Sequence, residues 1–311
     1  MIRILSEADV AARLSPADAL AIVRDAFLAA ERDAARNLPV LREHLGEQRI
    51  FGIKAAVDDS RGILGFKAGG AFPANLALGA SAHQSSIVLF DARTGGIQAV
   101  VAGNLITRLR TAAAAALSID LLARPDARTL GLLGAGTQAA AHVEAALRVR
   151  PFERIRLWSR SRERSAALAT RLRALCDVDV AVTPGDVARA SDVMITLTPA
   201  TAPLVAADLI RPGTHLACMG ADTIGKQEID AALAPRARLF TDDITQSVTI
   251  GELQTPFREK RITRDAIIGT LGTLLLGLAD GRRRPEDITV YDGTGVSLQD
   301  LLAASFVLGK T

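Results

Sequence analysis

Apolar and polar residues in the first hundred positions predict one amphipathic helix and then a series of short strands. The helix is expected to begin at Ser15-Pro16, because serine caps helix starts and proline fits the first turn. Glycines punctuate the apolar runs that follow. The expected strands are Ile50–Ala56, Gly65–Ala68, Ser86–Asp91 and Gly96–Val101. The last two strands are expected to form a hairpin with its turn at Arg93-Thr94-Gly95-Gly96.

From Asn104 onward the pattern changes to an Ala-rich helix, Asn104–Leu122, followed by strands and helices in regular alternation. The expected strands are Leu130–Leu133, Ile155–Trp158, Val178–Val182, Val193–Thr196, His215–Met219, Arg238–Thr241 and Ile288–Tyr291. Such alternation predicts a parallel sheet covered on both faces. We therefore expect an α/β chain with a Rossmann-type doubly wound parallel sheet, plus a smaller α+β domain. The apolar stretch Ala266–Ala279, too short to cross a bilayer, is expected to be a buried helix.

One turn in the second part carries a specific chemical signal. An apolar run ends in Gly134-Ala135-Gly136-Thr137-Gln138-Ala139, and a helical pattern follows from Ala139 to Arg150. Gly134 permits a tight turn, Gly136 lets a pyrophosphate approach the backbone, and Ala139 keeps the helix close to its strand. The free N–H groups of the helix start would face the phosphates. The turn predicts a dinucleotide site.

The tip of the second strand predicts which dinucleotide binds. An acidic residue there would accept hydrogen bonds from the adenosine ribose, whereas basic residues accept a 2′-phosphate. This strand runs out into Ser159-Arg160-Ser161-Arg162, and Glu153 precedes the strand, at the wrong end of the sheet. Arg160 and Arg162, with the hydroxyls of Ser159 and Ser161, form a reasonable phosphate clamp. We expect NADP(H) in preference to NAD(H).

Composition narrows the class of protein. The chain has 311 residues, enough for two domains, and 37 basic against 34 acidic residues, a balance that does not favour nucleic acid. Its two cysteines, Cys176 and Cys218, fit no metal spacing and no disulfide framework. The first ten residues lack the apolar core of a signal peptide. A soluble cytoplasmic protein, with no bound metal and no membrane or nucleic-acid partner, is expected.

Four charged residues outside the glycine loop are candidates for chemistry. Lys67 follows an apolar stretch. Arg110 lies near the start of the Ala-rich helix, and its planar guanidinium suits a carboxylate. Asp222 lies just past the carboxyl end of a predicted parallel strand, where ligands collect in open α/β sheets. Arg42 lies in the loop before the strands. Taken singly, each is more simply a solvated surface charge.

Three of these charged residues, Lys67, Arg110 and Asp222, each lie in a separate sequence motif. The motifs are Lys67–Gln84 with Pro73, Asn75, Gly79 and His83-Gln84; Leu105–Ala113 with Leu132–Gln138; and Gly220-Ala221-Asp222 with Gly225-Lys226-Gln227-Glu228-Ile229. In these motifs, and from about Arg42 to Gln299, the chain resembles the ornithine cyclodeaminase/μ-crystallin family. The resemblance implies a dinucleotide-binding domain at residues 119–298, and a substrate-binding and dimerisation domain at residues 1–118 with 299–311. It also implies a homodimer.

The resemblance further implies roles for individual residues. Lys67 would contact the substrate and shuttle a proton, Arg42 and Arg110 would hold the α-carboxylate of an amino or imino acid, and Asp222 would act on the amine as acid or base. The expected cofactor site comprises Arg110, Thr111, Gly134, Ala135, Gly136, Thr137, Gln138, Ser159, Arg160, Arg162, Thr198, Met219, Gly220 and Gly293.

Members of this family differ in the reaction they catalyse, and two signals in the sequence diverge. Ser159-Arg160 at the strand tip favours net NADPH-dependent reduction, as in ketimine reductases. Asp222 is instead shared with cyclodeaminases and alanine dehydrogenases and is absent from μ-crystallins. An NAD(P)H-dependent imino-acid reductase or amino-acid dehydrogenase is the first expectation. The alternatives are an ornithine cyclodeaminase that recycles bound NAD, and a non-catalytic μ-crystallin-like protein that binds NADP and a small ligand.

Overall fold

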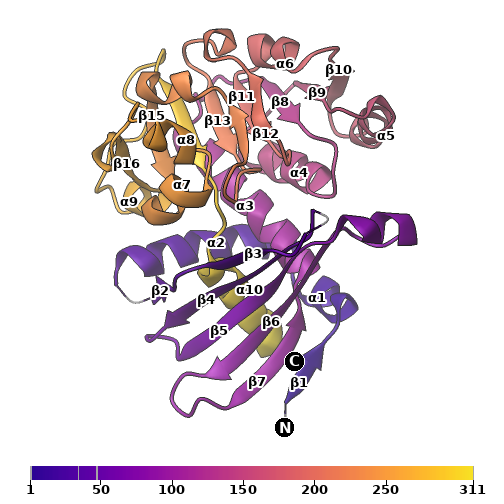
Figure 1. Cartoon of the computed structure of the whole chain (residues 1–311), viewed down its shortest axis with the longest axis vertical. Helices are drawn as coiled ribbons and strands as arrows, with labels where there is room; N and C mark the ends of the chain where they lie inside the picture. The colour runs from indigo at the N-terminus through magenta and orange to yellow at the C-terminus, as the bar shows by residue number, and fades with distance from the viewer. Residues whose placement is uncertain (1, 34, 47, 311) are drawn as a thin grey trace. The chain divides into compact units, whose positions relative to one another are not determined.

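The computed structural model describes residues 2–33, 35–46 and 48–310 and divides into two compact units (Figure 1). Unit 1 contains Met1–Arg110 and Val296–Thr311, and unit 2 contains Thr111–Gly295. The last segment of the chain thus completes the first unit. The functional division at residues 118 and 298 expected from the sequence stays a prediction.

Unit 1 is built on a seven-stranded mixed sheet with the order β1-β7-β6-β5-β4-β2, in which β3 also pairs with β4. The strands are β1 (Arg3–Leu5), β2 (Ala35–Asn37), β3 (Leu41–His44), β4 (Ile50–Asp58), β5 (Ile63–Ala71), β6 (His83–Asp91) and β7 (Ile97–Ala102). The four strands expected from the sequence are present, and the Arg93–Gly96 turn joins β6 to β7 as an antiparallel pair. The short β1, β2 and β3 were not expected.

Helices cover one face of this sheet (Figure 1). They are α1 (Glu7–Arg13), α2 (Pro16–Glu31) and α10 (Ser297–Gly309). A short 3-10 helix, Pro73–Leu78, lies in the connection from β5 to β6. The Ser15 hydroxyl accepts a hydrogen bond from the Asp18 amide, which confirms the predicted start of α2. Helix α10 packs against β4, β5 and β6, and Ile87, Leu89 and Leu301 lie in the core between them.

Unit 2 contains an eight-stranded parallel sheet with the order β10-β9-β8-β11-β13-β17-β15-β16. Its strands are β8 (Thr129–Leu133), β9 (Arg154–Trp158), β10 (Asp177–Val180), β11 (Val193–Thr196), β13 (His215–Cys218), β15 (Ala237–Thr241), β16 (Ile267–Thr270) and β17 (Ile288–Asp292). A separate pair is formed by β12 (Thr201–Val205) and β14 (Gln227–Ile229). Each strand predicted from the apolar pattern of this unit is present, within two residues at either end.

The helices of unit 2 connect these strands (Figure 1). They are α4 (Ala139–Val149), α5 (Arg162–Leu172), α6 (Pro184–Ala190), α7 (Ile244–Ile250), α8 (Gln254–Arg258) and α9 (Leu271–Leu275), with 3-10 turns at Ala207–Leu209, Ala231–Arg236 and Arg264–Ala266. Helix α3 (Asn104–Leu122) has the predicted bounds and continues from unit 1 into unit 2. Among the described residues, no helix is long and apolar enough to cross a bilayer.

The prediction of one buried helix over Ala266–Ala279 was wrong. The stretch forms strand β16 and then the short helix α9. The Thr270 hydroxyl accepts hydrogen bonds from the two amides that begin α9, so the threonine starts a new element inside the apolar run. Gly277 then has a φ of +69°, which ends the helix, and Leu278 is 71% exposed.

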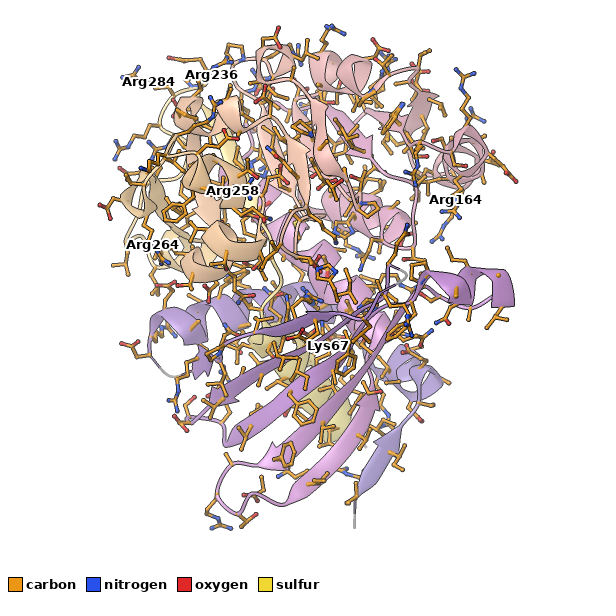
Figure 2. The ribbon with its side chains drawn as sticks, in the orientation of Figure 1. Lys67, Arg164, Arg236, Arg258, Arg264 and Arg284 are labelled. Atoms are coloured by element: carbon orange, nitrogen blue, oxygen red, sulfur yellow. The ribbon has the colours of Figure 1, made fainter. Side chains whose placement is uncertain are left out.

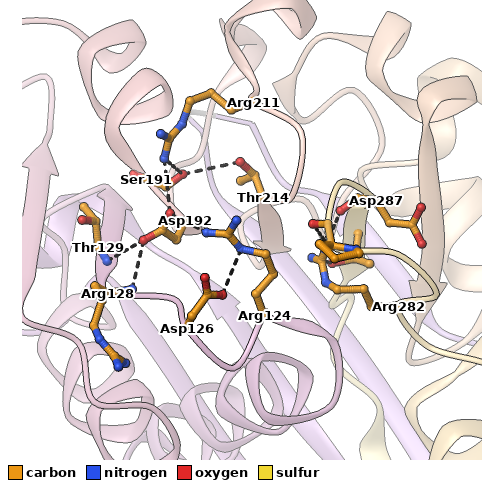
Figure 3. A network of polar contacts seen from close by, with 12 residues as sticks. Arg124, Asp126, Arg128, Thr129, Ser191, Asp192, Arg211, Thr214, Arg282 and Asp287 are labelled. Carbon is orange, nitrogen blue, oxygen red and sulfur yellow. Dashed lines mark hydrogen bonds and ion pairs between the residues drawn. The ribbon is translucent and has the colours of Figure 1, made fainter.

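A polar network fixes the amino ends of β8 and β11 (Figure 3). The Asp192 carboxylate accepts hydrogen bonds from the amides of Arg128 and Thr129 and pairs with Arg124 and Arg211 at 3.2 and 3.3 Å. These strand ends lie opposite the carboxyl edge that carries the glycine loop. The network therefore holds the sheet together rather than forming part of a ligand site.

Candidate active site

Lys67 is a buried lysine in the middle of β5, on the face of the sheet that α10 covers (Figure 2). Its Nζ lies 2.8 Å from the Asp300 Oδ2 and donates a hydrogen bond of 3.3 Å to the Thr107 Oγ1. Asp300 stands in the first turn of α10, and Thr107 in α3. Three elements distant in the sequence thus hold one ammonium group.

Asp300 is shared between two cations. Its Oδ1 accepts a hydrogen bond of 3.0 Å from the Arg110 Nε, while its Oδ2 pairs with Lys67. Asp300 is fully buried, and Arg110 is 6% exposed. Asp300 was not among the predicted site residues, although an aspartate inside the apolar run Leu298–Leu308 is a signal of a buried ion pair.

Burial and neighbouring charges change the protonation of this cluster. Burial, and then the Arg110 guanidinium and more weakly Arg42, lower the pKa of Lys67 to about 8, although Asp300 acts in the opposite direction. Burial alone would raise the pKa of Asp300, but Arg110 and Lys67 outweigh it and hold the pKa below its ordinary value. Lys67 is therefore able to exchange a proton near neutral pH while Asp300 stays ionised.

Two further cations lie around the cluster. Arg42 is half-buried on β3, and its side chain passes over Gly52 of β4, where an added Cβ would lie 3.2 Å from the Arg42 Cδ. Lys54 is buried on β4, directly opposite Lys67 across the strand pair. The structure thus brings together the predicted Lys67, Arg42 and Arg110, and adds Lys54, which was not predicted.

The glycine loop of unit 2 has the form that the sequence predicts. Gly134 has a φ of +118°, and a side chain there would also approach the Leu197 carbonyl oxygen to 2.9 Å. An added Cβ on Gly136 meets no atom within 4 Å, so the backbone is open to a close ligand. Ala139 is fully buried at the start of α4. These residues fit a dinucleotide pyrophosphate at the helix start, flanked by the half-buried Ala135 and Gln138 and the exposed Thr137.

The tip of β9 presents arginines to solvent. Arg160 and Arg162 are both exposed, whereas the Ser159 hydroxyl contacts the Ser161 carbonyl and the Ser165 hydroxyl. Ser161 caps α5 through the Arg164 amide. The two serine hydroxyls thus organise the helix start, and the arginines remain as the charged groups at the tip.

Two of the other predicted cofactor residues of unit 2, Thr198 and Gly220, contact a buried acid that was not among the predicted site residues, Glu228. It accepts hydrogen bonds from the amide and hydroxyl of Thr198, both at 2.6 Å, and from the Gly220 amide at 3.0 Å. Met219 lies against Gly293, where an added Cβ would be 2.6 Å from its sulfur. Glu228 therefore ties together the loops after β11 and β13, where the dinucleotide is expected.

Two more buried acids continue this arrangement. Glu252 accepts from the amides of Glu228 and Ile229, and Asp292 accepts from the Glu252 amide and the Ser247 hydroxyl. Burial raises the pKa of Asp292 to about 7 and the pKa of Glu252 well above its ordinary value. No group of three or more metal-ligating side chains occurs among the described residues. These acids brace loops through backbone amides.

Asp222 lies on the loop after β13, as predicted. Its carboxylate is 2.6 Å from the Lys226 Nζ and accepts a hydrogen bond from the Thr223 hydroxyl. The side chain is 36% exposed, so it remains within reach of solvent and ligands. Thr111, which was expected in the cofactor site, is buried in α3.

Comparison with known proteins assigns this arrangement to a family. The model of the ornithine cyclodeaminase/mu-crystallin family matches residues 2–311. The chain belongs to this family. The membership predicted from the three motifs is confirmed, and the match extends beyond the predicted span of residues 42–299.

Individual relatives cover almost the whole chain. The iminosuccinate reductase of Paracoccus denitrificans is 40% identical over 98% of the chain and 95% of its own length. The alanine dehydrogenase of Archaeoglobus fulgidus is 30% identical over 98% of the chain and 93% of its own length.

Solved structures agree with these matches. The structure of the Paracoccus iminosuccinate reductase in complex with NAD+ superimposes with a TM-score of 0.90, at 39% identity, covering 99% of the chain and 95% of that protein. An archaeal alanine dehydrogenase dimer with bound NAD gives a TM-score of 0.93, at 28% identity, covering 99% and 97%. The predicted fold class, a Rossmann-type parallel sheet plus a smaller mixed-sheet domain, is confirmed.

Proposed function

We propose that this chain is an NAD(P)H-dependent imino-acid reductase that converts a small α-imino acid into the corresponding α-amino acid. The chain's family and its named relatives place it among the NAD(P)-dependent oxidoreductases that act on imino or amino acids. The observation that carries the proposal is the buried Lys67, with its pKa lowered to about 8, between Asp300 and Arg110. A protein that only binds a ligand has no need of a proton donor tuned to neutral pH.

The residues of the cluster have distinct tasks in this reaction. NAD(P)H, when bound at the glycine loop, supplies the hydride to the imine carbon. Arg110 and Arg42 hold the α-carboxylate, because a planar guanidinium matches its two oxygens. As the C=N electron pair moves to nitrogen, the Lys67 ammonium gives that nitrogen a proton, so imine, hydride and proton become an amine. Asp300 holds Lys67 and Arg110 in position throughout.

Asp222 has a predicted role in the same reaction. A carboxylate near the substrate nitrogen stabilises the positive charge of an iminium and can accept a proton in the oxidative direction. The Lys226 Nζ lies 2.6 Å from this carboxylate, so a cation faces it. We propose that Asp222 acts on the amine as acid or base for the second proton, the one that converts the neutral amine formed with the Lys67 proton into its ammonium form.

The proposal is tested with purified protein, NAD(P)H and a panel of substrates. The panel contains oxaloacetate with ammonia, pyruvate with ammonia, pyrroline-2-carboxylate, piperideine-2-carboxylate and L-ornithine. The ketoacids with ammonia supply iminosuccinate and iminopropionate. Cofactor oxidation with an imino acid supports the reductase. Ammonia release from ornithine without net cofactor change supports a cyclodeaminase, and tight cofactor binding without any turnover supports a binding protein.

The arginines at the tip of β9 predict a preference for NADPH over NADH. Replacing both Arg160 and Arg162 by serine is expected to lower kcat/KM for NADPH by about 10–100-fold, the effect of one or two charge-assisted hydrogen bonds. The value for NADH should change little. Steady-state kinetics with both cofactors measure the ratio, and Arg173→Ser, at the other end of α5, is the matched control. A wild-type preference for NADH, or equal losses with both cofactors, would contradict the assignment.

The second face of the unit 1 sheet predicts a homodimer. Phe66 and Phe90, whose rings are 5.9 Å apart, and Val88 lie half-buried on the face opposite α10. An apolar face of this kind is expected to pack against the same face of a second copy, as the archaeal relative is a dimer. Phe66→Glu is expected to give a monomer in size-exclusion chromatography with light scattering.

A matched control separates this effect from a general loss of apolar surface. Leu278→Glu changes an exposed leucine of unit 2 and should leave the dimer intact. A wild-type monomer, or a Phe66→Glu dimer with unchanged dissociation constant, would show that the strand face is not the interface.

A further inference from the structure

We infer that Thr107 is a positioning residue, whose hydroxyl holds the terminal nitrogen of Lys67 in place both before and after the lysine gives up its proton. The inference deepens the proposed function and rests on it, because it concerns the proton donor of the same reaction. It is carried by the contact between the two side chains, by the fixed start of α3, and by the chemistry of a hydroxyl group.

The contact joins two buried side chains. The Thr107 Oγ1 accepts a hydrogen bond of 3.3 Å from the Lys67 Nζ, and the two residues are 6% and 8% exposed. The same Nζ forms an ion pair of 2.8 Å with the Asp300 carboxylate. An ammonium group has three N–H donors, so two acceptors on different helices, α3 and α10, determine the direction of the third. In the proposed reaction this third donor serves the imine nitrogen.

The start of α3 is anchored within unit 1, so the position of Thr107 is fixed. The Glu7 carboxylate accepts hydrogen bonds from the first two amides of the helix, at 2.8 and 3.0 Å. The Asn104 side chain accepts a hydrogen bond of 2.9 Å from the Ser85 amide of β6. Thr107 follows in the first turn, where its amide donates to the Gly103 carbonyl. An acceptor on such a rigid element can hold a lysine side chain at one point.

A hydroxyl differs from a carboxylate in what it offers to a lysine. An ionised carboxylate such as that of Asp300 only accepts hydrogen bonds, whereas a hydroxyl both accepts and donates. Thr107 accepts from the ammonium before proton transfer. Once the Lys67 proton has moved to the substrate nitrogen, the lysine is a neutral amine with a lone pair, and the hydroxyl can rotate and donate to it. The Nζ is therefore held in both states of the reaction.

A purely structural role for Thr107 makes a different prediction. If its hydroxyl only completed the packing of α3, its loss would lower stability and leave the protonation of Lys67 unchanged. A hydrogen bond accepted from an ammonium stabilises the charged form and is stronger than one donated to a neutral amine. The pKa of Lys67 in Thr107→Val should therefore fall below its wild-type value of about 8. The other charged groups around Lys67 stay in place in this variant; they are Asp300 on α10, Arg110 on α3, Arg42 on β3 and Lys54 on β4.

The kinetic experiment compares wild type, Thr107→Val and Thr107→Ser with the imino acid of the panel that wild type reduces. Thr107→Val keeps the β-branched shape and is expected to lower kcat by about 10–100-fold. The KM for the imino acid should change by less than about threefold, because the arginines that hold its carboxylate remain. Thr107→Ser keeps the hydroxyl and should retain most of the activity. The control is Thr214→Val, which removes a buried hydroxyl that donates to the Ser191 carbonyl at the amino end of β13.

A measurement without turnover tests the contact itself. The chain has five lysines, so protein labelled with ¹³C at the lysine Cε gives few NMR signals, and the Lys67 signal is the one missing in Lys67→Arg. Its titration midpoint should lie near pH 8 in wild type, Thr107→Ser and Thr214→Val, and at lower pH in Thr107→Val. If wild type reduces no imino acid but the midpoint moves in this way, the reductase proposal fails and the positioning of Lys67 by Thr107 stands.

A lower midpoint together with a lower kcat in Thr107→Val, both restored in Thr107→Ser, supports the inference. An unchanged midpoint or an unchanged kcat in Thr107→Val would overturn it. A loss carried by KM rather than kcat would instead make Thr107 a substrate contact, and equal losses in Thr107→Val and Thr214→Val would reduce its role to structure; each of these results also overturns the inference.

Discussion

Lys67→Met is expected to lower kcat/KM for imino-acid reduction by about 1000-fold while leaving NAD(P)H binding unchanged. The substitution removes both the proton donor and one cation of the carboxylate site, and each general-acid contribution is worth about 10²–10⁴-fold. Cofactor binding should survive because the glycine loop belongs to unit 2 and Lys67 to unit 1. Steady-state kinetics and a cofactor fluorescence titration measure the two properties separately. Substantial turnover in the variant would remove Lys67 from the mechanism.

The same residue predicts the pH dependence. The protonated lysine acts in reduction, and the pKa of Lys67 is lowered to about 8, so kcat/KM for reduction should fall as the pH rises past 8. The oxidation of the amino acid needs the neutral lysine and should rise over the same interval. In Lys67→Arg the fall of kcat/KM above pH 8 should be absent, because arginine stays protonated throughout the range. An unchanged fall in that variant would assign the titration to another group.

Asp300→Ala is expected to cause the largest loss of stability in unit 1. The variant leaves Lys67 and Arg110 buried together without their shared counter-ion, and breaking a buried ion pair on one side costs about 3–5 kcal/mol. Denaturant unfolding gives the free energy, and hydrogen exchange should show lost protection in β4, β5 and α10 rather than in β8 and α4. Asparagine keeps the size of the side chain but removes its charge. The free energy of unfolding of Asp300→Asn should therefore lie between that of Asp300→Ala and that of wild type.

A surface ion pair supplies the control for this measurement. Glu153 pairs with Arg128 at 3.1 Å, but the two side chains are 74% and 46% exposed. Glu153→Ala is expected to change the free energy of unfolding by less than about 1 kcal/mol. If Asp300→Ala proved no more destabilising than Glu153→Ala, the description of Asp300 as a buried counter-ion would be wrong.

Much of the fold of unit 2 could be predicted because short stretches of sequence encode its strands and its glycine turn. Each buried parallel strand is a short apolar run, and the glycine turn before α4 must have a left-handed residue such as Gly134. The helix predicted over Ala266–Ala279 failed because one hydroxyl, that of Thr270, divides an apolar run into strand and helix. Apolar character alone does not reveal such a cap.

The candidate site was predicted only in part because its missing members are distant in the sequence. Lys67 and Arg110 stand out as charges beside apolar segments, but their shared partner Asp300 comes 190 residues after Arg110. Lys54 gains meaning only from the β4–β5 register, which no local pattern defines. Glu228 belongs to the third of the three sequence motifs, yet its role in joining two loops depends on contacts with Thr198 and Gly220.

The decisive experiment on imino-acid reduction follows both the cofactor and the amino-acid product. Purified protein is incubated with NAD(P)H, oxaloacetate and ammonia, and cofactor oxidation and aspartate formation are measured in the same reaction. We expect one aspartate for each cofactor molecule oxidised, with both signals lost in Lys67→Met. Cofactor oxidation without aspartate, or aspartate formation that persists in Lys67→Met, would contradict it.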